Sequence, residues 1–440
     1  MPVTYRHMKK QPRHRKASRT REGGPSRPTK CKHTVFRQAC NLIPVHMIPK
    51  LAREFKIDAR KFSETSHFFS LLFTHFARTD SLNETCDALR VHEAEFLRTR
   101  EATPPARNTF SNANRTRDPA MAEALYWQML KYLQELCPGF TQYGKHAGFL
   151  FRLKRGIFAM DSSTLQLTLA SIDWARHRRK KAAAKCHMRI DIGTFLPVFA
   201  VVEEAGHHDS VRAETLCAGL VAGDVLLGDR AYVDFSFLSD LNQREVFFVL
   251  RPKKNMLFDV LKELPCKGKI LRDVLVKPTL EKSSKAYGAG PLRLVTAIVE
   301  VNGVEREMTF ITNNTNWSAR TIAELYRARW VIEVFFKEIK QTLQLRDFIG
   351  TNDKAVKWQV WSGLMAHLLL RFIKHISKWR HSFSRCVGIV RAALWVKADL
   401  LEILLCYGTA NGPHRPVTSS KQPFLPGFGA FSSCPMGQHG

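Results

Sequence analysis

The chain has few acidic side chains for its length. Of its 440 residues, 39 are Asp or Glu and 68 are Lys or Arg, which gives a formal net charge of +29. Such an excess raises the potential around the whole molecule and favours a polyanionic partner. Nucleic acid is the first candidate, because phosphate neutralisation with counterion release supplies most sequence-independent affinity.

Long apolar runs and cysteine pairs with metal-ligand spacing are also missing. No apolar run approaches the ~18 residues needed to span a bilayer, and the first residues lack the apolar stretch of a secretion signal. We therefore expect a cytoplasmic protein with no membrane partner. The ten cysteines include no Cys-x-x-Cys pair, which argues against a zinc ribbon and gives no disulfide framework. We expect reduced thiols.

Both ends of the chain have compositions that disfavour folding. Residues 1–33 are rich in Lys and Arg and poor in apolar side chains, so we predict a disordered basic arm. A solubilising tail and a misassigned start codon are the alternatives. Residues 408–440 are rich in Gly, Pro and Ser and are predicted to form a disordered tail.

Residues 34–150 have the periodicity of helices, and we predict a helical N-terminal domain that binds DNA. Ser81, followed by Glu84 three residues later, has the pattern of a capping box. The segment 107–115 is rich in Arg, Asn, Ser and Thr, side chains that suit a helix in a major groove. An ordinary exposed helix explains that segment equally well. Apolar residues recur at helical spacing, as in Met121-Leu125-Met129-Leu133.

From residue 151 the periodicity changes to that of strands. Five short β-branched or aromatic runs occur in the order three strands, helix, strand, helix, strand. This order predicts an α/β fold with a mixed sheet. The predicted strands are Ile157–Ser162, Lys185–Asp191, Leu196–Glu203, Val225–Leu227 and Val246–Leu250, and the helices are Val211–Leu220 and Phe235–Leu241.

A β-rich insertion and further helices follow. Two strand-like runs flank Asn302-Gly303, a strong hairpin signal, and we predict a small β insertion at 265–313. We assign 151–264 and 314–380 to one catalytic domain and 381–407 to a C-terminal helix. The runs are Leu292–Val301 and Val304–Thr312, and the helices are one capped by Ser318 and ending near Leu345, then Lys357–Trp379 and Arg391–Leu405.

Three carboxylates stand out by their context. Asp161 and Asp229 each end an apolar strand, where a side chain lies at the rim of a sheet on a rigid backbone. Glu333 lies on the long helix, on a narrow stripe beside the apolar face. The alternatives are strand-terminating turn residues and a solvated face of ion pairs. The stripe also holds Tyr326, Arg329 and Lys340.

Carboxylates in such positions suit phosphodiester chemistry. In-line cleavage gains most from two hard divalent cations, one activating the nucleophile and one stabilising the leaving oxygen. Mg²⁺ is bound through carboxylates and substrate phosphates, and Arg, Lys and Tyr side chains beside it would hold phosphate groups. These parts together predict phosphoryl transfer on DNA.

At these residues the sequence resembles the DDE transposases of bacterial cut-and-paste insertion sequences. One group of that family is marked by Tyr, Arg, Glu and Lys spaced two, three and six residues apart. The stripe reproduces this signature, for which a chance match has a probability on the order of 10⁻³. The likeness runs from about residue 35 to about 405. Short motifs around the signature also fit the family: Asp161-Ser-Ser-Thr, Trp174 with a basic run into Lys185-Cys-His187, Leu196-Pro197, His208-Asp209-Ser210, Asp229-Arg230-Ala-Tyr232 and Phe248-Val-Leu-Arg251.

The resemblance implies a ribonuclease H-like core. The first Asp lies on its first strand, the second Asp after its fourth strand and the Glu on a later helix, with a β insertion before that Glu. It implies Asp161, Asp229 and Glu333 as catalytic residues and ligands of two Mg²⁺ ions, for which Mn²⁺ would substitute. The implied DNA contacts are Tyr326, Arg329, Lys340, Arg230 and Arg251.

The implied activity is metal-dependent cleavage at the ends of an insertion sequence and strand transfer into target DNA. The partners are then double-stranded DNA, as terminal inverted repeats and as target, and a second copy of the chain in a synaptic complex. The location is the bacterial cytoplasm, in association with the nucleoid. The alternatives are another ribonuclease H-like endonuclease and an inactive or repurposed DNA-binding derivative of a transposase.

Some residues depart from the family pattern or compete with its carboxylates. Ala231 stands where the family usually has Gly, and we expect little effect. Two rival carboxylates, Asp191 and Asp209, fit family words without being metal ligands there and are expected to be structural. The other rivals are Asp173, Asp224 and Asp234.

Overall fold

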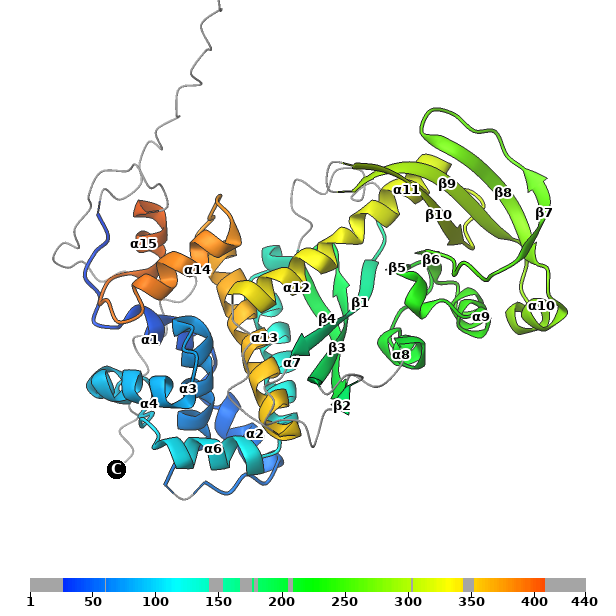
Figure 1. The fold of residues 1–440 in the computed structure, drawn as a ribbon. Helices are drawn as coiled ribbons and strands as arrows, with labels where there is room; N and C mark the ends of the chain where they lie inside the picture. The colour runs from blue at the N-terminus through cyan, green and yellow to red at the C-terminus, as the bar shows by residue number, and fades with distance from the viewer. Residues whose placement is uncertain are drawn as a thin grey trace, which may run out of the picture.

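The computed structural model describes residues 27–59, 61–141, 153–166, 176–177, 181–204, 209–301, 304–342 and 352–407. Within them, a helical part and a sheet lie side by side, and a long run of helix connects the two (Figure 1). The predicted tail and residues 1–26 of the predicted arm lie outside the described residues. No helix in the described part of the chain is long and apolar enough to cross a membrane.

The helical part is built from both halves of the chain. Its longest helix, α13 (Asp353–Ile376), is buried along most of its length and packs against α3, α6 and α7. Trp358 of α13 donates from Nε1 to the carbonyl oxygen of Arg117 at 3.1 Å, which ties the two halves together. The N-terminal helices are α1 (Val35–Cys40), α2 (Met47–Glu54), α3 (Glu64–Ala77), α4 (Leu82–Val91), α5 (Glu93–Leu97), α6 (Arg107–Thr116) and α7 (Ala120–Leu136), followed by a short 3₁₀ turn, η1 (Pro138–Thr141).

The predicted cap at Ser81 is confirmed. Its hydroxyl accepts a hydrogen bond from the amide of Glu84 at 3.1 Å and starts α4. The Glu84 carboxylate accepts from the amide of Asp80 at 2.7 Å, one residue before the cap. The pair therefore satisfies two backbone donors at the helix start, as a capping box does.

The prediction of a mixed α/β sheet is confirmed, and β1 lies at its centre. β1 pairs antiparallel with β3 and parallel with β5. β3 pairs antiparallel with β4, and β5 pairs parallel with β6. A two-residue strand, β2 (Arg176–His177), also pairs with β3. The main elements are β1 (Ile157–Gln166), β3 (Lys181–Asp191), β4 (Leu196–Glu204), α8 (Asp209–Leu216), β5 (Val225–Gly228), α9 (Phe235–Gln243) and β6 (Phe247–Leu250).

The β insertion extends this sheet to ten strands in the order β2-β3-β1-β5-β6-β10-β9-β8-β7, with β4 on β3. The predicted hairpin of β9 and β10 is confirmed by their antiparallel pairing. β7, β8 and α10 were not predicted. Bulges interrupt both β7 and β8, and a bulge shifts the two-residue alternation that marks a strand. The elements are β7 (Phe258–Glu263), β8 (Ile270–Pro278), α10 (Glu281–Tyr287), β9 (Leu292–Val301) and β10 (Val304–Thr312).

The single helix predicted from Ser318 is two helices, α11 (Ala319–Ala328) and α12 (Trp330–Thr342). Ser318 caps α11 as predicted, accepting from the amide of Thr321 at 3.1 Å. The break is at Arg329, whose amide bonds back only three residues, to the Tyr326 carbonyl at 3.0 Å. The two helices run end to end from the β9–β10 side of the sheet to the helical part (Figure 1).

The predicted helix Arg391–Leu405 is wrong, because residues 393–399 are not helical. Carbonyl groups of this segment instead accept hydrogen bonds from the start of α1. The amide of Val35 donates to the Val396 carbonyl at 3.1 Å, and the amide of Phe36 donates to the Leu394 carbonyl at 2.9 Å. Asp399 then caps a new helix. The two helices observed are α14 (Phe383–Ala392) and α15 (Leu400–Cys406).

Candidate active site

Asp161 and Asp229 lie at the same level of neighbouring parallel strands. β1 and β5 are paired from Ile157 with Val225 to Ala159 with Leu227, and each aspartate lies two residues beyond the last pair. Side chains at one register of adjacent parallel strands lie on one face of a sheet. The geometry therefore directs both carboxylates to the same side.

The prediction that Asp161 ends its strand is wrong. β3 continues to pair with β1 as far as Gln166, so Asp161 lies in mid-strand opposite Met188. On the other side of β1, however, β5 ends at Gly228. Asp161 thus lies at the rim formed by the end of β5, with its side chain 23% exposed.

Gly228 leaves room for side chains from both neighbouring strands. A Cβ at this position would lie 2.9 Å from Cδ2 of Leu250 on β6 and 3.0 Å from Cε of Met160 on β1. Asp229 follows directly and starts a short 3₁₀ turn, accepting from the amide of Arg230 at 2.8 Å. The pairing of β5 with β1 and β6 therefore holds Asp229 beside β1.

Arg329 links the carboxylate on the helix to the carboxylate on the sheet. Its guanidinium donates to Oδ2 of Asp161 at 3.2 Å and to Oε1 of Glu333. The Arg329 side chain is only 12% exposed. Because Asp161 lies on β1 and Glu333 on α12, this bridge joins the first and third of the predicted carboxylates.

Two further arginines lie beside Asp229. Arg251, just after β6, places a guanidinium nitrogen 3.7 Å from Oδ1 of Asp229. Arg230 is exposed, as is Ala231, where the family pattern has Gly. The structure therefore groups the Arg251 side chain with the second carboxylate, whereas Arg230 contacts that carboxylate through its backbone amide.

The surroundings of Asp161 disfavour the ionised form of its carboxyl group. Burial raises its pKa from 3.8 to about 6, against the opposing effects of Arg329 and the Ser162 amide, and the charges of Glu333 and Asp229 raise it further. Burial acts to lower the pKa of Arg329, but Tyr326, Asp161 and Glu333 outweigh it and raise that pKa. The three carboxylates thus interact electrostatically across the site.

Tyr326 and Lys340 take different positions along the long helical run. The ring of Tyr326 is buried, with its centroid 4.6 Å from that of Phe310, and the Arg329 guanidinium lies over it at 5.4 Å. Lys340 lies farther along α12 and is half-buried near Cys186 of β3, and burial lowers the pKa of Lys340. Burial also raises the pKa of the Cys186 thiol to about 12, so this neighbour is uncharged. Tyr326 therefore belongs to the Arg329 cluster, whereas Lys340 faces β3.

The donor atoms of this site suit a hard divalent cation, which prefers carboxylate oxygens. A cationic group, the Arg329 guanidinium, already lies between two of the carboxylates. In the part of the chain that the structure describes, no group of three or more His, Cys, Asp or Glu side chains converges closely enough to hold a metal ion. The carboxylates fit a metal in their chemistry, with Arg329 between Asp161 and Glu333.

Three of the rival carboxylates hydrogen-bond to nearby backbone amides. Such contacts are typical of turns and helix caps, and no described contact links these three carboxylates to Arg329 or Glu333. Asp173 and the side chain of Asp209 lie outside the described residues. The contacts are Asp191 with Gly193 N at 2.7 Å, Asp224 with Val221 N at 3.0 Å and Asp234 with Ser236 N at 2.9 Å.

An ion pair that the sequence analysis did not anticipate holds the far side of α12. Glu338 accepts from Arg371 of α13 and lies 3.4 Å from Nε2 of His367. The Arg371 guanidinium lies over the ring of Phe195 at 3.9 Å. No sequence signal could have found this pair, because its members lie on separate helices and 33 positions apart.

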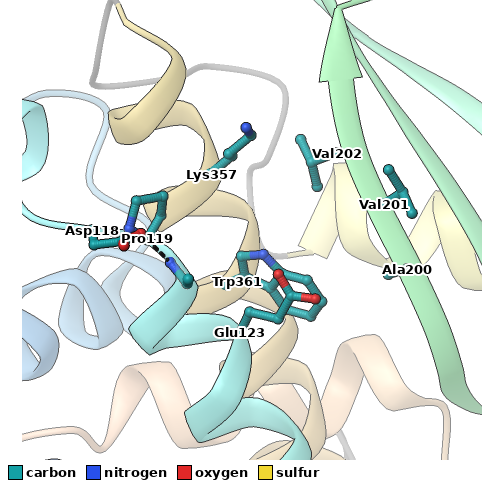
Figure 2. Close-up of a pocket in the computed structure, with 9 residues that line it drawn as sticks. Asp118, Pro119, Glu123, Ala200, Val201, Val202, Lys357 and Trp361 are labelled. Atoms are coloured by element: carbon teal, nitrogen blue, oxygen red, sulfur yellow. Dashed lines mark hydrogen bonds between the residues drawn. The ribbon is translucent and has the colours of Figure 1, made fainter. Parts of the chain in front are cut away.

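A cavity of about 250 Å³ lies away from these carboxylates, between α7, α13 and β4 (Figure 2). Trp361 and the side chains of Glu123 and Lys357 line it on the helical side, and β4 closes the other side. Asp118, which also lines it, accepts from the Ala120 amide at 2.9 Å. Its lining includes none of the predicted catalytic residues.

Comparison with protein families gives two matches. Residues 152–369 match the family described as Transposase DDE domain. Residues 31–97 match a domain of unknown function (DUF4372). The first match contains all three carboxylates and the whole Tyr-Arg-Glu-Lys stripe, and the second covers the first helices.

Three curated proteins are similar to parts of the chain, and each is named as a transposase. The one from Sinorhizobium fredii is 28% identical over 236 residues, 52% of this chain and 64% of that protein. The one for an insertion sequence element of Geobacillus stearothermophilus is 29% identical over 50% of this chain and 58% of that protein. The one for an insertion sequence element of Synechocystis is 22% identical over 60% of this chain and 71% of that protein.

These matches are partial, since the chain spans about three fifths of the length of the first two relatives. Among solved structures, a piggyBac transposase in a synaptic complex with hairpin DNA aligns at 11% identity and a TM-score of 0.43, covering 88% of this chain and 85% of that one. This TM-score is too low for the likeness to bear on fold or function.

Proposed function

We propose that this chain, whose residues 152–369 belong to the transposase DDE domain family, is a DNA transposase that cuts the ends of an insertion sequence and joins them to target DNA. One observation carries the proposal. Asp161 on β1 and Asp229, directly after the parallel strand β5, lie level with each other, and Arg329 connects Asp161 to Glu333 of α12. The names of the three relatives support the same activity.

We propose further that the core of the sheet is ribonuclease H-like. The support is the strand order β4-β3-β1-β5-β6, with β1 antiparallel to β3 and parallel to β5. Asp161 lies on the first strand of this core, Asp229 follows the fourth of its five main strands, and Glu333 lies on a later helix. This is the placement that the family resemblance implies.

Asp161, Asp229 and Glu333 would hold two Mg²⁺ ions, or Mn²⁺ in their place. Such ions supply charge stabilisation and lower the pKa of the attacking water or hydroxyl. The protein's own part is to hold the carboxylates on rigid elements and to position the DNA. Arg251, beside Asp229, and the exposed Arg230 would bind phosphates that flank the reacting one.

The signature side chains have separate tasks in this proposal. Arg329 and Lys340 bind phosphates of the element end, and the ring of Tyr326 packs against the Arg329 guanidinium. Lys340 is close to β3 rather than to β5, so it would contact a different phosphate from Arg251. The DNA end would therefore be held on both sides of the carboxylates.

Recognition of the element ends is assigned to residues 34–150. α6 supports this assignment, because it buries Phe110 and Ala113 and exposes a face of Arg and Asn side chains. Those side chains can contact base edges and phosphates. The full complex would hold two copies of the chain with two inverted repeats and target DNA, on the nucleoid in the bacterial cytoplasm. The exposed Arg and Asn side chains are Arg107, Asn108, Asn112 and Arg115.

The test is cleavage of a duplex that carries the element end, with Mg²⁺ or Mn²⁺. We expect Ala at Asp161, Asp229 or Glu333 to abolish cleavage and to leave DNA binding in the absence of metal nearly intact, because each loses a metal ligand and no DNA contact. Asp234→Ala is the matched control: it removes a nearby carboxylate that caps α9 and should keep cleavage. Cleavage at the wild-type rate by Asp161→Ala would overturn the proposal.

A further inference from the structure

Arg329 occupies the space between two carboxylates that come from different elements. Its two terminal nitrogens contact Asp161 on β1 and Glu333 on α12, and 168 positions separate it from Asp161. The side chain is 12% exposed, against 23% for Asp161 and 35% for Glu333. The cation is thus more deeply enclosed than the anions that it bridges.

The guanidinium is not fully satisfied in this position. Its Nε is buried without a well-formed hydrogen bond, and so is the hydroxyl of Tyr326, which interacts with this guanidinium. An arginine that donates from all its nitrogens would need one more acceptor, and a phosphate oxygen is the acceptor that guanidinium groups favour most. The two carboxylates therefore hold Arg329 in place, while a phosphate would satisfy its remaining donor.

A divalent cation that approaches Asp161 and Glu333 meets this fixed positive charge. Like charges at such short range repel, and burial strengthens the repulsion because little water screens it. Arg329 and a metal ion thus compete for the same two carboxylates. DNA can relieve the competition, since its phosphates offer Arg329 another anion nearby.

We propose that Arg329 closes the carboxylate pair while DNA is absent, and that a DNA phosphate draws its guanidinium away and opens the pair to a divalent cation. Metal loading is then coupled to DNA binding, and by linkage each strengthens the other by the same factor. This inference rests on the proposed function and adds its regulation. The coupling keeps the carboxylate pair closed to metal ions until DNA is bound.

The first experiment titrates Mn²⁺ calorimetrically into the full-length protein without DNA. We expect Arg329→Met to bind Mn²⁺ about tenfold more tightly than wild type, a coupling of ordinary size. The matched control is Arg327→Met, which removes the same charge two residues earlier from an exposed position and should stay close to wild type. Arg329→Lys keeps the charge without the two-pronged contact and should fall between.

The second experiment measures binding of a short fluorescent duplex by anisotropy, with and without Mn²⁺. Mn²⁺ should tighten binding by wild type and by Arg327→Met about tenfold, and by Arg329→Met much less. If Mn²⁺ binds Arg329→Met no more tightly than Arg327→Met, the inference is wrong and Arg329 only organises the carboxylates. If neither wild type nor any variant binds Mn²⁺, the proposed metal-dependent function fails as well.

Discussion

At the scale of single residues, ionisation of the buried Asp161 carboxyl group lowers the stability of the folded protein. Its pKa is raised to about 6, chiefly by burial, from 3.8 in an unfolded chain. Between these values, a rise in pH ionises the unfolded state before the folded state, so folding stability falls across this window. The contribution of Asp161 to stability is therefore fully present below about pH 3.8 and is lost as pH rises through about 6.

Asp161→Asn should therefore stabilise the metal-free protein at neutral and alkaline pH. The amide keeps the shape of the side chain without the buried charge, and Arg329 retains Glu333 as a partner. We expect a gain of about 1–3 kcal/mol at pH 8 in the presence of a chelator, since one pKa unit corresponds to about 1.4 kcal/mol. Urea unfolding at pH 8 and below pH 4 measures both ends of the window. Equal stability of the two proteins at pH 8 would contradict this prediction.

The identity of the candidate residues could be predicted from sequence, but their pairing could not. Strand ends and helical spacing indicated Asp161, Asp229 and Glu333, because local patterns of apolar residues fix which element carries each. The direction of the Arg329 guanidinium depends on how α12 crosses β1, and the contact of Arg251 with Asp229 depends on the pairing of β5 with β6. Neither is a property of a local segment.

At the scale of elements, α12 is fixed from its far side. Glu338 on α12 pairs with Arg371 on α13, and the Arg371 guanidinium lies over the rings of Phe195 at 3.9 Å and Phe383 at 4.6 Å. Burial lowers the pKa of the neighbouring His367 to about 4, so that ring is neutral at pH 7. The ion pair therefore sets where α12, and with it Glu333, lies against the sheet.

Arg371→Met should destabilise the protein by about 3 kcal/mol, because it leaves the Glu338 carboxylate enclosed without a cation. The double variant Arg371→Met with Glu338→Leu should recover most of this loss, since replacing both members of an enclosed pair by apolar groups is close to neutral. Urea unfolding of both single variants, the double variant and wild type completes the cycle. If the double variant is no more stable than Arg371→Met, the two side chains do not act as a pair.

Regular elements were predictable where their periodicity is unbroken. All five core strands follow from apolar runs, and the hairpin of β9 and β10 follows from Asn302-Gly303 and its flanks. The failures have physical causes. Pairing with β3 extends β1 beyond its apolar run, bulges hide β7 and β8, and the contacts of α1 interrupt what periodicity alone predicts to be one helix at Arg391–Leu405.

At the scale of the whole molecule, the excess of positive charge predicts strongly salt-dependent DNA binding. Residues 1–26 carry much of the charge of the predicted arm, whereas Thr29 and Cys31 hydrogen-bond to the segment that leads into α15. A deletion that tests the arm should therefore stop at residue 26. Removal of 1–33 would also break these contacts and confuse affinity with stability.

Deletion of 1–26 should weaken binding to every duplex and flatten the dependence of affinity on salt, because fewer counterions are released. Anisotropy titrations over a range of KCl, with an element-end duplex and a random duplex, measure both effects. A matched chain in which the Lys and Arg of 1–26 are replaced by Gln separates charge from length. An effect confined to the element-end duplex would show that the arm reads sequence.

The contacts between the two ends of the described chain also affect how the chain folds during its synthesis. Thr29 donates its amide to the carboxylate of Glu402, 373 positions later, and α1 begins with amides that donate to carbonyls at 394 and 396. During synthesis at about 5–20 residues per second, the start of the chain waits roughly 20–70 s for these acceptors to be made. A ribosome that stops before residue 394 leaves α1 without them, so an incomplete chain has an open helical core for proteases and chaperones to recognise.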